Sequence, residues 1–371
     1  MKVPFIDLTR EAHFLMDELR EETDQVLQSG QYINGPKVKK FEQEFADYCN
    51  VDYSVSLGNG SDGLTFIMKA LGVGEGDTVI CPGNSFIASA WSIVAAGAKP
   101  IFCDVNEDML ISVEEIKKVI SPSTKAIMAV HLTGKLCEVD EISNFCKEKN
   151  IFLIEDSAQA VGAKDKNNNK AGSFGIAASF SLHPLKNLAV YGDGGIVTTN
   201  NKSLFEKILL LRNHGLINRD QSKIWGYNSR LDELQAAYAL IKLRHLEEFT
   251  KRYISIAKLY SENLSNKIIK PKISPTQRDV FHNYVIRVKP SHRNQIMDLL
   301  LKKGVETKIH YPIPLHLQEC SSSLGHREGD IPNVENYSRS MISLPIYPLL
   351  KNEEIEFVIE TLNNIIEKIK I

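Results

Sequence analysis

The residue with the clearest chemical potential is a single lysine between apolar neighbours. Lys186 lies in the run SLHPLKNL, which contains a proline and precedes the glycine-rich tract YGDGG. If its side chain is partly removed from water, its pKa falls and the neutral amine becomes a better nucleophile. The more common alternative is an amine that reaches out to solvent. The local sequence leaves both interpretations open.

Asp156 is the second candidate, because it stands at the end of an apolar run at 151–154, in the segment IEDSAQ. A carboxylate at the end of a buried strand is costly unless a cation or a strong donor pairs with it. We therefore expect Asp156 to have such a partner. Capping of a following helix is an equally good explanation on this evidence.

A glycine-rich turn, GNGSDG at 58–63, supplies a third feature. Small residues allow backbone N–H groups and the Ser61 hydroxyl to surround an anion at a helix N-terminus. An ordinary turn from strand to helix uses similar residues. Taken together, an anion cradle, a carboxylate and a desolvated lysine are the parts that a pyridoxal phosphate site requires. They would be its phosphate anchor, its partner for the ring nitrogen and its Schiff-base lysine.

Other catalytic signatures are missing from the sequence. It has no GxxxxGK[ST] P-loop, no GxSxG and no HExxH, so nucleoside triphosphate, serine hydrolase and zinc peptidase chemistry lose their simplest support. The six cysteines are dispersed and form no CxxC pair. This spacing predicts neither a disulfide framework nor a metal site.

The elements that must position these residues follow from the pattern between 53 and about 199. Short β-branched or aromatic runs alternate there with helix-like stretches, which predicts an α/β fold with a mostly parallel sheet covered on both faces. The expected strands are residues 53–57, 78–81, 99–104, 125–130, 152–156, 177–181 and 195–199. A helix beginning near 231 should lead into a smaller module with a strand at 281–288, a helix at 294–303, a strand at 306–310 and an amphipathic closing helix.

The charge balance limits the class of partner. The 371 residues carry 44 Lys and Arg against 46 Asp and Glu, a formal net charge of -2, and no block of like charges. Nucleic acid or a membrane surface is therefore not expected as the main partner, whereas a small molecule is. Without a signal peptide or a long apolar run, the sequence predicts a cytoplasmic protein.

Eight motifs stand in an order that closely resembles the DegT/DnrJ/EryC1/StrS family of pyridoxal-phosphate-dependent sugar aminotransferases. They are GNGSDGL, PGNSFIASA, HLTG, IEDSAQAVGA, FSLHPLKNLAVYGDGG, LRNHG, GYNSRLDELQAA and HYPIPLHL. The resemblance implies the fold-type I, aspartate aminotransferase-like architecture: a large sheet domain at 1–248, a small C-terminal α/β domain at 249–371, and a homodimer with shared active sites.

The resemblance also assigns roles to residues. Lys186 would be the Schiff-base lysine and proton shuttle, Asp156 would hold the ring nitrogen protonated, and Gln159 would contact the ring hydroxyl. Phe86 would stack on the ring. The phosphate would be bound by Gly60, Ser61 and Ser181, and by Asn228 from the neighbouring subunit. The side chains expected to border the substrate are His183, Arg230, His310 and Tyr311, and Lys135 and His183 are expected to influence the choice of sugar.

The implied reaction moves the amino group of L-glutamate to a keto sugar. The GDGG form of the glycine tract resembles members that act at C3 of 3-keto, 6-deoxy nucleotide sugars more than the GEGG members that act at C4. A C4 aminotransferase, an unactivated keto sugar or keto-inositol as substrate, and a regulator that binds coenzyme or sugar without catalysis are the alternatives. The last exists because a fold does not fix a function.

Overall fold

A computed structural model describes residues 1–369 of the chain. Its centre is a seven-stranded sheet with the order β1-β7-β6-β5-β4-β2-β3. The strands are β1 (Tyr53–Leu57), β2 (Thr78–Pro82), β3 (Lys99–Cys103), β4 (Thr124–Val130), β5 (Phe152–Asp156), β6 (Ala177–Ser181) and β7 (Gly195–Thr199). Only β7 runs antiparallel to its neighbours β1 and β6. The mostly parallel α/β sheet predicted from the sequence is confirmed.

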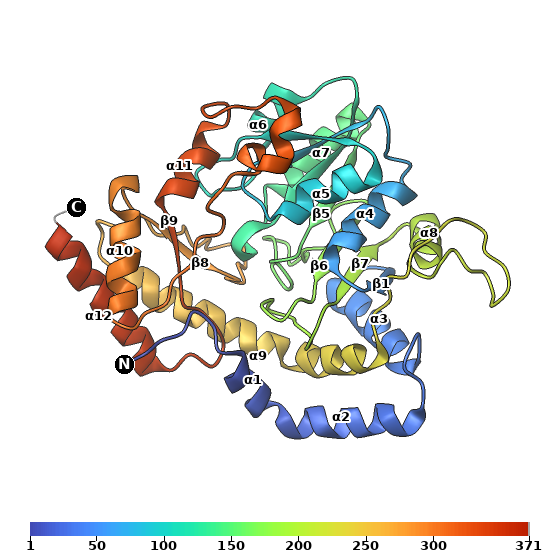
Figure 1. The fold of residues 1–371 in the computed structure, drawn as a ribbon, viewed down its shortest axis with the longest axis horizontal. Coiled ribbons are helices and arrows are strands. Elements are labelled where there is room, and N and C mark those ends of the chain that lie inside the picture. The colour runs from blue at the N-terminus through green and yellow to red at the C-terminus, as the bar shows by residue number, and fades with distance from the viewer. Residues whose placement is uncertain (370–371) are drawn as a thin grey trace.

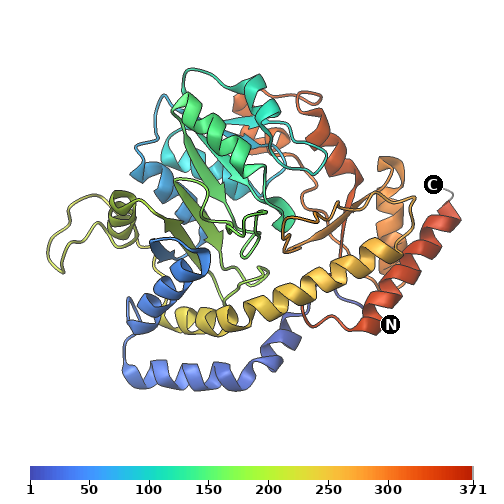
Figure 2. The ribbon, with the colours of Figure 1, turned by 180° about the vertical axis from the view of Figure 1, so that it is seen from behind.

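Helices cover both faces of this sheet, as its nearly continuous burial requires. In Figure 1, α4 (Gly60–Ala70) and α5 (Ile87–Ala96) lie in front of the strands, whereas α3 (Pro36–Cys49) and α7 (Val139–Lys149) lie in front in Figure 2. The remaining helices of this part are α6 (Val113–Val119) and α8 (Lys202–Arg212). A large apolar core fills the space between these layers.

The N-terminus forms an arm that reaches across the molecule. Helices α1 (Leu8–Phe14) and α2 (Met16–Ser29) run alongside α9 (Glu233–Asn263), as Figure 2 shows. Before α1, the chain pairs with the C-terminal part, since Val3 forms a bridge to Val305. Arg10 then donates two hydrogen bonds to Glu354, which fasten the arm to the last helix.

The C-terminal part packs around a second apolar core. Its elements are β8 (Tyr284–Arg287), α10 (Pro290–Lys302), α11 (Pro332–Ser340), β9 (Met341–Leu344) and α12 (Asn352–Ile369). Strands β8 and β9 form an antiparallel pair. The closing helix buries the apolar stripe that the sequence predicted, with Ile355, Val358 and Leu362 almost fully covered.

One expected strand in this part is wrong. Residues 306–310 form no strand, because they make only isolated contacts: Lys308 bridges to Ser343, and the Glu306 N–H bonds the Val3 carbonyl. The segment contacts two different neighbours, and it does not form a continuous ladder of backbone hydrogen bonds with either of them. The strand expected at 281–288 is also shorter, since Phe281 has a positive φ of 49° and β8 begins only at Tyr284.

The boundary proposed at 248/249 lies inside α9, which runs unbroken for 31 residues. Leu246 on this helix packs in a cluster with Phe180 of the large sheet, whereas Tyr253, two turns later, packs in the C-terminal core. The change of partner supports the division, which remains a proposal. No helix within residues 1–369 is long and apolar enough to cross a membrane.

Candidate active site

A cavity of about 410 Å³ opens at the carboxyl edge of the parallel strands. Parallel strands end on one side of a sheet, and open α/β folds bind ligands there. Ten of the thirteen site residues expected from the sequence line this cavity: Gly60, Ser61, Phe86, Asp156, Gln159, Ser181, His183, Lys186, His310 and Tyr311. The structure therefore brings together residues that are up to 251 positions apart.

Asp156, the last residue of β5, faces the cavity while only 6% exposed. Its carboxylate accepts a hydrogen bond of 2.6 Å from the Ser89 hydroxyl and one of 3.2 Å from the Ala158 N–H. A turn, and no helix, follows the strand, so helix capping does not explain this residue. A buried carboxylate that two donors hold in place can accept a hydrogen bond from a cationic N–H group of a ligand.

Lys186 enters the same cavity from the loop after β6. Its backbone N–H bonds the His183 carbonyl at 2.8 Å, which closes the turn around Pro184. Burial lowers the pKa of the Lys186 amine to about 8, although the negative charge of Asp156 acts in the opposite direction. The amine lies in the cavity and not on the outer surface, which favours the nucleophilic interpretation of this lysine.

The anion cradle forms at the start of α4. Asn59 caps this helix by accepting a bond from the Asp62 N–H, and the free N–H groups of Gly60 and Ser61 begin the first turn. The first residue of β7, Gly195, packs directly against this turn. It must be glycine, because a Cβ on it would lie 2.3 Å from the Asn59 carbonyl carbon. The N-terminus of α4 also lies close to Ser181, since a Cβ on Gly60 would be 3.1 Å from the Ser181 Cα, and both line the cavity.

The same six residues, 58–63, also have the GxGxxG spacing of dinucleotide-binding folds. In those folds the strand before the glycines is central and parallel to its neighbours. Here β1 is an edge strand that pairs only with β7, and that pairing is antiparallel. The motif therefore lies at a different place in the sheet than in dinucleotide-binding folds. The feature that the two have in common is the helix N-terminus, which can bind an anion.

Two aromatic rings and an amide shape the opposite wall. The Gln159 amide donates to the Tyr311 hydroxyl at 3.2 Å and accepts a bond of 2.7 Å from the Thr133 N–H. The ring of Phe86, which is 53% exposed, lies 5.8 Å from that of Tyr311. Phe86 is therefore free to cover a flat ligand, whereas Gln159 is fixed in orientation.

The cavity also contains residues to which the sequence assigned no role, notably Phe5, His282 and Asn283, together with Asp193 of the GDGG tract. Phe5 comes from the N-terminal arm and packs 5.7 Å from the ring of His310. Burial and the nearby Lys186 lower the pKa of His310 to about 4, so this imidazole is neutral. No periodicity or motif marks the residues at 5 and 282–283, which reach the site only through tertiary packing.

Comparison with known proteins agrees with this geometry. A profile of the DegT/DnrJ/EryC1/StrS aminotransferase family matches residues 14–363. The chain belongs to this aminotransferase family. It is 40% identical over 363 residues to the dTDP-3-amino-3,6-dideoxy-alpha-D-galactopyranose transaminase of Aneurinibacillus thermoaerophilus, covering 97% of this chain and 99% of that protein.

Two further relatives cover nearly the whole aminotransferase. The pleiotropic regulatory protein of Geobacillus stearothermophilus is 38% identical over 365 residues, 97% of each chain. The crystal structure of DesV from S. venezuelae, in complex with a ketimine intermediate, matches with a TM-score of 0.96 and 35% identity over 99% of both chains. The expected family and fold-type I architecture are confirmed, and the protein is an enzyme.

Two residues expected in the site lie outside the cavity of their own chain. Asn228 is exposed in the segment 213–229, part of the olive loop that projects beyond α8 in Figure 1. Arg230 donates to the Asn213 side chain at 3.2 Å, so it braces the base of this loop. For Asn228 this position agrees with a contact to a second subunit, which stays a prediction.

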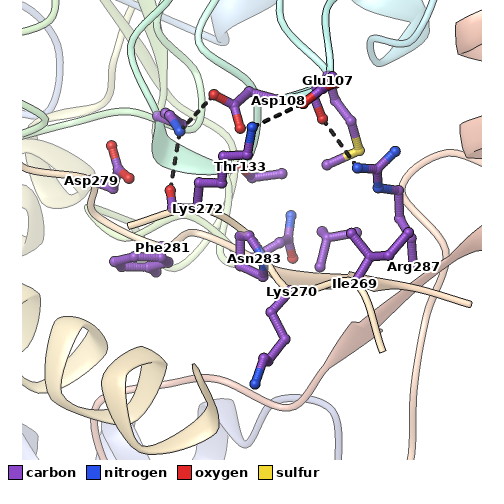
Figure 3. Close-up of a pocket in the computed structure, with 14 residues that line it drawn as sticks. Glu107, Asp108, Thr133, Ile269, Lys270, Lys272, Asp279, Phe281, Asn283 and Arg287 are labelled. Atoms are coloured by element: carbon purple, nitrogen blue, oxygen red, sulfur yellow. Dashed lines mark hydrogen bonds and ion pairs between the residues drawn. The ribbon is translucent and has the colours of Figure 1, made fainter. Parts of the chain in front are cut away.

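Lys135, expected to face the sugar, is in a different place. It lines a separate pocket of about 60 Å³, drawn in Figure 3. Its ammonium group donates to the Asp108 carboxylate at 3.0 Å and to the Lys272 carbonyl at 3.1 Å. Lys135 does not line the large cavity. Asn283 lines both pockets, and Thr133 of the small pocket donates its N–H to Gln159 of the large one.

Proposed function

We propose that this aminotransferase uses pyridoxal phosphate to transfer the amino group of L-glutamate to a keto carbon of a nucleotide-linked sugar. The observation that carries the proposal is the convergence of three groups in one cavity: Lys186, Asp156 and the N-terminus of α4. The ketimine bound to DesV supports it, because a ketimine joins an amine nitrogen to a former ketone carbon.

The residues present fit this coenzyme. Pyridoxal phosphate supplies an aldehyde that condenses with amines and a cationic ring that withdraws electrons from the bond to be broken. Asp156, buried and held by Ser89, would keep the ring nitrogen protonated. Ser61, Ser181 and the first N–H groups of α4 would bind the phosphate, and Phe86 would cover the ring.

Lys186 would hold the coenzyme and then move the proton. With a pKa near 8, roughly one amine in ten is neutral at pH 7, compared with about one in three thousand for an ordinary lysine. Once released by the incoming amine, Lys186 would take the proton from the α-carbon of glutamate and deliver it to the coenzyme's C4′ atom. The same amine would reverse this transfer on the sugar.

We propose C3 of a 3-keto, 6-deoxy sugar as the acceptor. Asp193, the acidic residue of the GDGG tract, lines the cavity, so the tract that distinguishes C3 from C4 members is in a position to contact the sugar. The relative from Aneurinibacillus, named for a 3-amino sugar, supports this choice. Amination at C4 is the alternative. The cytoplasmic location expected from the sequence is part of the same proposal.

The homodimer is also proposed. Asn228 would reach the phosphate of the partner's coenzyme, since it is exposed at the base of the loop 213–229, where it pairs with Asn213, and does not line the cavity of its own chain. The loop carries Trp225, which is 98% exposed, and Ile217, which is 57% exposed. Such apolar side chains are typical of a surface that another protein covers.

The test is a pair of half-reactions followed by absorption. Protein with coenzyme bound to Lys186 should absorb near the visible edge and lose this band when L-glutamate is added. A 3-keto nucleotide sugar should then restore the band, and Lys186→Ala should show neither change. Restoration by a 4-keto sugar alone would overturn the C3 assignment.

The regulator alternative has one observation in its favour, the name of the Geobacillus relative. Family membership makes this chain an enzyme, so regulation would be an additional role. Loss of the band with glutamate, followed by no recovery with any keto sugar of a C3 and C4 panel, would contradict sugar amination and favour a sensor.

A further inference from the structure

His282 is a cavity residue to which neither sequence nor family resemblance gave a role. It precedes β8, is partly buried, and lines the same cavity as Lys186 and His310. Its neighbour Asn187 directly follows Lys186 in the chain. The imidazole therefore lies beside the loop that carries the reactive amine.

The tautomer of His282 follows from the groups around Asn187. The Asn187 Nδ2 donates to the Val280 carbonyl at 3.1 Å, and a carbonyl only accepts, so the amide has one orientation. Its Oδ1 is therefore the atom 3.0 Å from the His282 Nδ1. Because an amide oxygen also only accepts, Nδ1 must carry the hydrogen.

The other ring nitrogen is then a bare acceptor. Burial, together with the charge of Lys186 and the neighbouring His310 and His183, holds the pKa of His282 well below its usual value. Asp156, a carboxylate of the same cavity, accepts bonds from Ser89 and Ala158 and makes none with His282. Within residues 1–369, the His282 Nε2 has no hydrogen-bond partner.

We propose that His282 determines specificity by accepting, through Nε2, a hydrogen bond from a sugar hydroxyl on a carbon next to the one that receives the amine. This rests on the proposed function, because Lys186 must act on the reacting carbon for a neighbouring hydroxyl to lie near His282. A site with an acceptor fixed in this way discriminates against substrates that lack the donor, since the acceptor is then left unpaired.

The matched probes are amino sugars used in the reverse direction. One is dTDP-3-amino-3,6-dideoxy-α-D-galactopyranose, and the second is dTDP-3-amino-3,4,6-trideoxy-α-D-glucose, which lacks the 4-hydroxyl. The third is the 2-deoxy analogue of the first. With wild type we expect one deoxy probe to have a kcat/KM about 10- to 100-fold lower than the parent. His282→Phe should abolish this difference, and His282→Gln, which retains an acceptor, should restore part of it.

The glutamate half-reaction separates the possible outcomes. If His282 acts on the sugar, His282→Phe slows the sugar half-reaction about tenfold or more beyond any effect on the glutamate half-reaction. Equal slowing of both half-reactions would mean that His282 positions Lys186, and it would overturn the proposal. So would wild type that accepts all three probes equally, or a penalty that persists in His282→Phe. Wild type that does not react with glutamate would instead contradict the proposed function.

A spectroscopic measurement tests the tautomer without turnover. The chain contains ten histidines, so selective ¹⁵N-histidine labelling of the coenzyme-loaded protein gives a small set of signals. The pair that disappears in His282→Gln should show one protonated and one bare nitrogen between pH 6 and 8. Asn187→Asp should convert it to a doubly protonated ring, because a carboxylate stabilises the cation. A doubly protonated ring in wild type would overturn the proposal.

Discussion

At the scale of single residues, the orientation of Asp156 depends on one serine. Ser89 is completely buried, and its hydroxyl makes the shorter of the two bonds to this carboxylate. Hydrogen bonds to charged groups contribute about 1.5–3 kcal/mol. Ser89→Ala should therefore weaken coenzyme binding about 10- to 100-fold, as measured by fluorescence titration of the coenzyme-free protein.

The control for this variant is Ser92→Ala, one turn further along α5. Ser92 is equally buried, but its hydroxyl bonds the Ser89 carbonyl at 3.0 Å and does not touch Asp156. Both variants remove one buried hydroxyl, so both should lower the free energy of unfolding by a similar amount. Equal coenzyme affinity in the two variants would show that Ser89 does not orient the carboxylate.

Lys186 gives a prediction about pH. Its amine is protonated below a pKa of about 8 and neutral above it, and only the neutral form attacks the coenzyme aldehyde. The rate of recombination between coenzyme-free protein and pyridoxal phosphate should rise about tenfold per pH unit up to about pH 8 and then level off. Stopped-flow absorption measures this rate.

Lys242 is the matched control for that profile. Burial also lowers the pKa of this lysine to about 8, but it pairs with Glu11 in the N-terminal arm and lies outside the cavity. Lys242→Arg should leave the profile unchanged. A wild-type rate that continues to rise toward pH 10 would mean that Lys186 has an ordinary pKa.

The two adjacent carboxylates of IEDSAQ, Glu155 and Asp156, show which part of the site the sequence predicts. Asp156 was expected to have a donor partner, and it has two. Glu155 points to the opposite face of β5, where it accepts bonds from His131 and three backbone N–H groups of residues 172–175. Strand alternation makes the two side chains diverge, but only packing decides which one borders the cavity.

At the scale of elements, the N-terminal arm forms part of the site wall. The Phe5 N–H donates to the Glu306 carboxylate, and its ring packs on His310. Phe5→Ala should therefore raise the KM for the keto sugar about tenfold by removing apolar surface from the wall. Steady-state kinetics with a fixed glutamate concentration gives this value.

Phe14→Ala provides the comparison, because Phe14 belongs to the same arm but packs on His245 and Phe249, away from the cavity. It should lower stability slightly and leave the KM for the sugar unchanged. If both variants raise this KM alike, the arm acts through general stability and not through Phe5.

Elements in the large domain were easier to predict than those in the C-terminal part. The seven strands of the main sheet are short, mostly buried runs separated by turns and helix-like stretches, so their pattern is local. The segment at 306–310 is more polar, and its backbone contacts are with Val3 and Ser343, which are far away in the sequence. Whether such an extended segment becomes a strand depends on partners that no local pattern reveals.

At the scale of the whole molecule, the proposed dimer predicts complementation between two inactive variants. Lys186→Ala damages the cavity of its own chain, whereas Asn228→Ala would damage that of its partner. Random mixing makes half of the dimers mixed, and each of these has one intact site, so about 25% of wild-type activity should return. No recovery after verified subunit exchange would mean that Asn228 does not act across subunits.

Helix α9 has a consequence for how the chain can be divided. Leu246 and Tyr253 lie on opposite sides of the proposed boundary, yet they belong to one unbroken helix that is about 46 Å long. A cut at residue 248 would leave each fragment with half a helix and its apolar side chains uncovered. The proposed domains therefore cannot be separated at this boundary without exposing those side chains, and an exchange of either part with a relative should keep α9 as one piece.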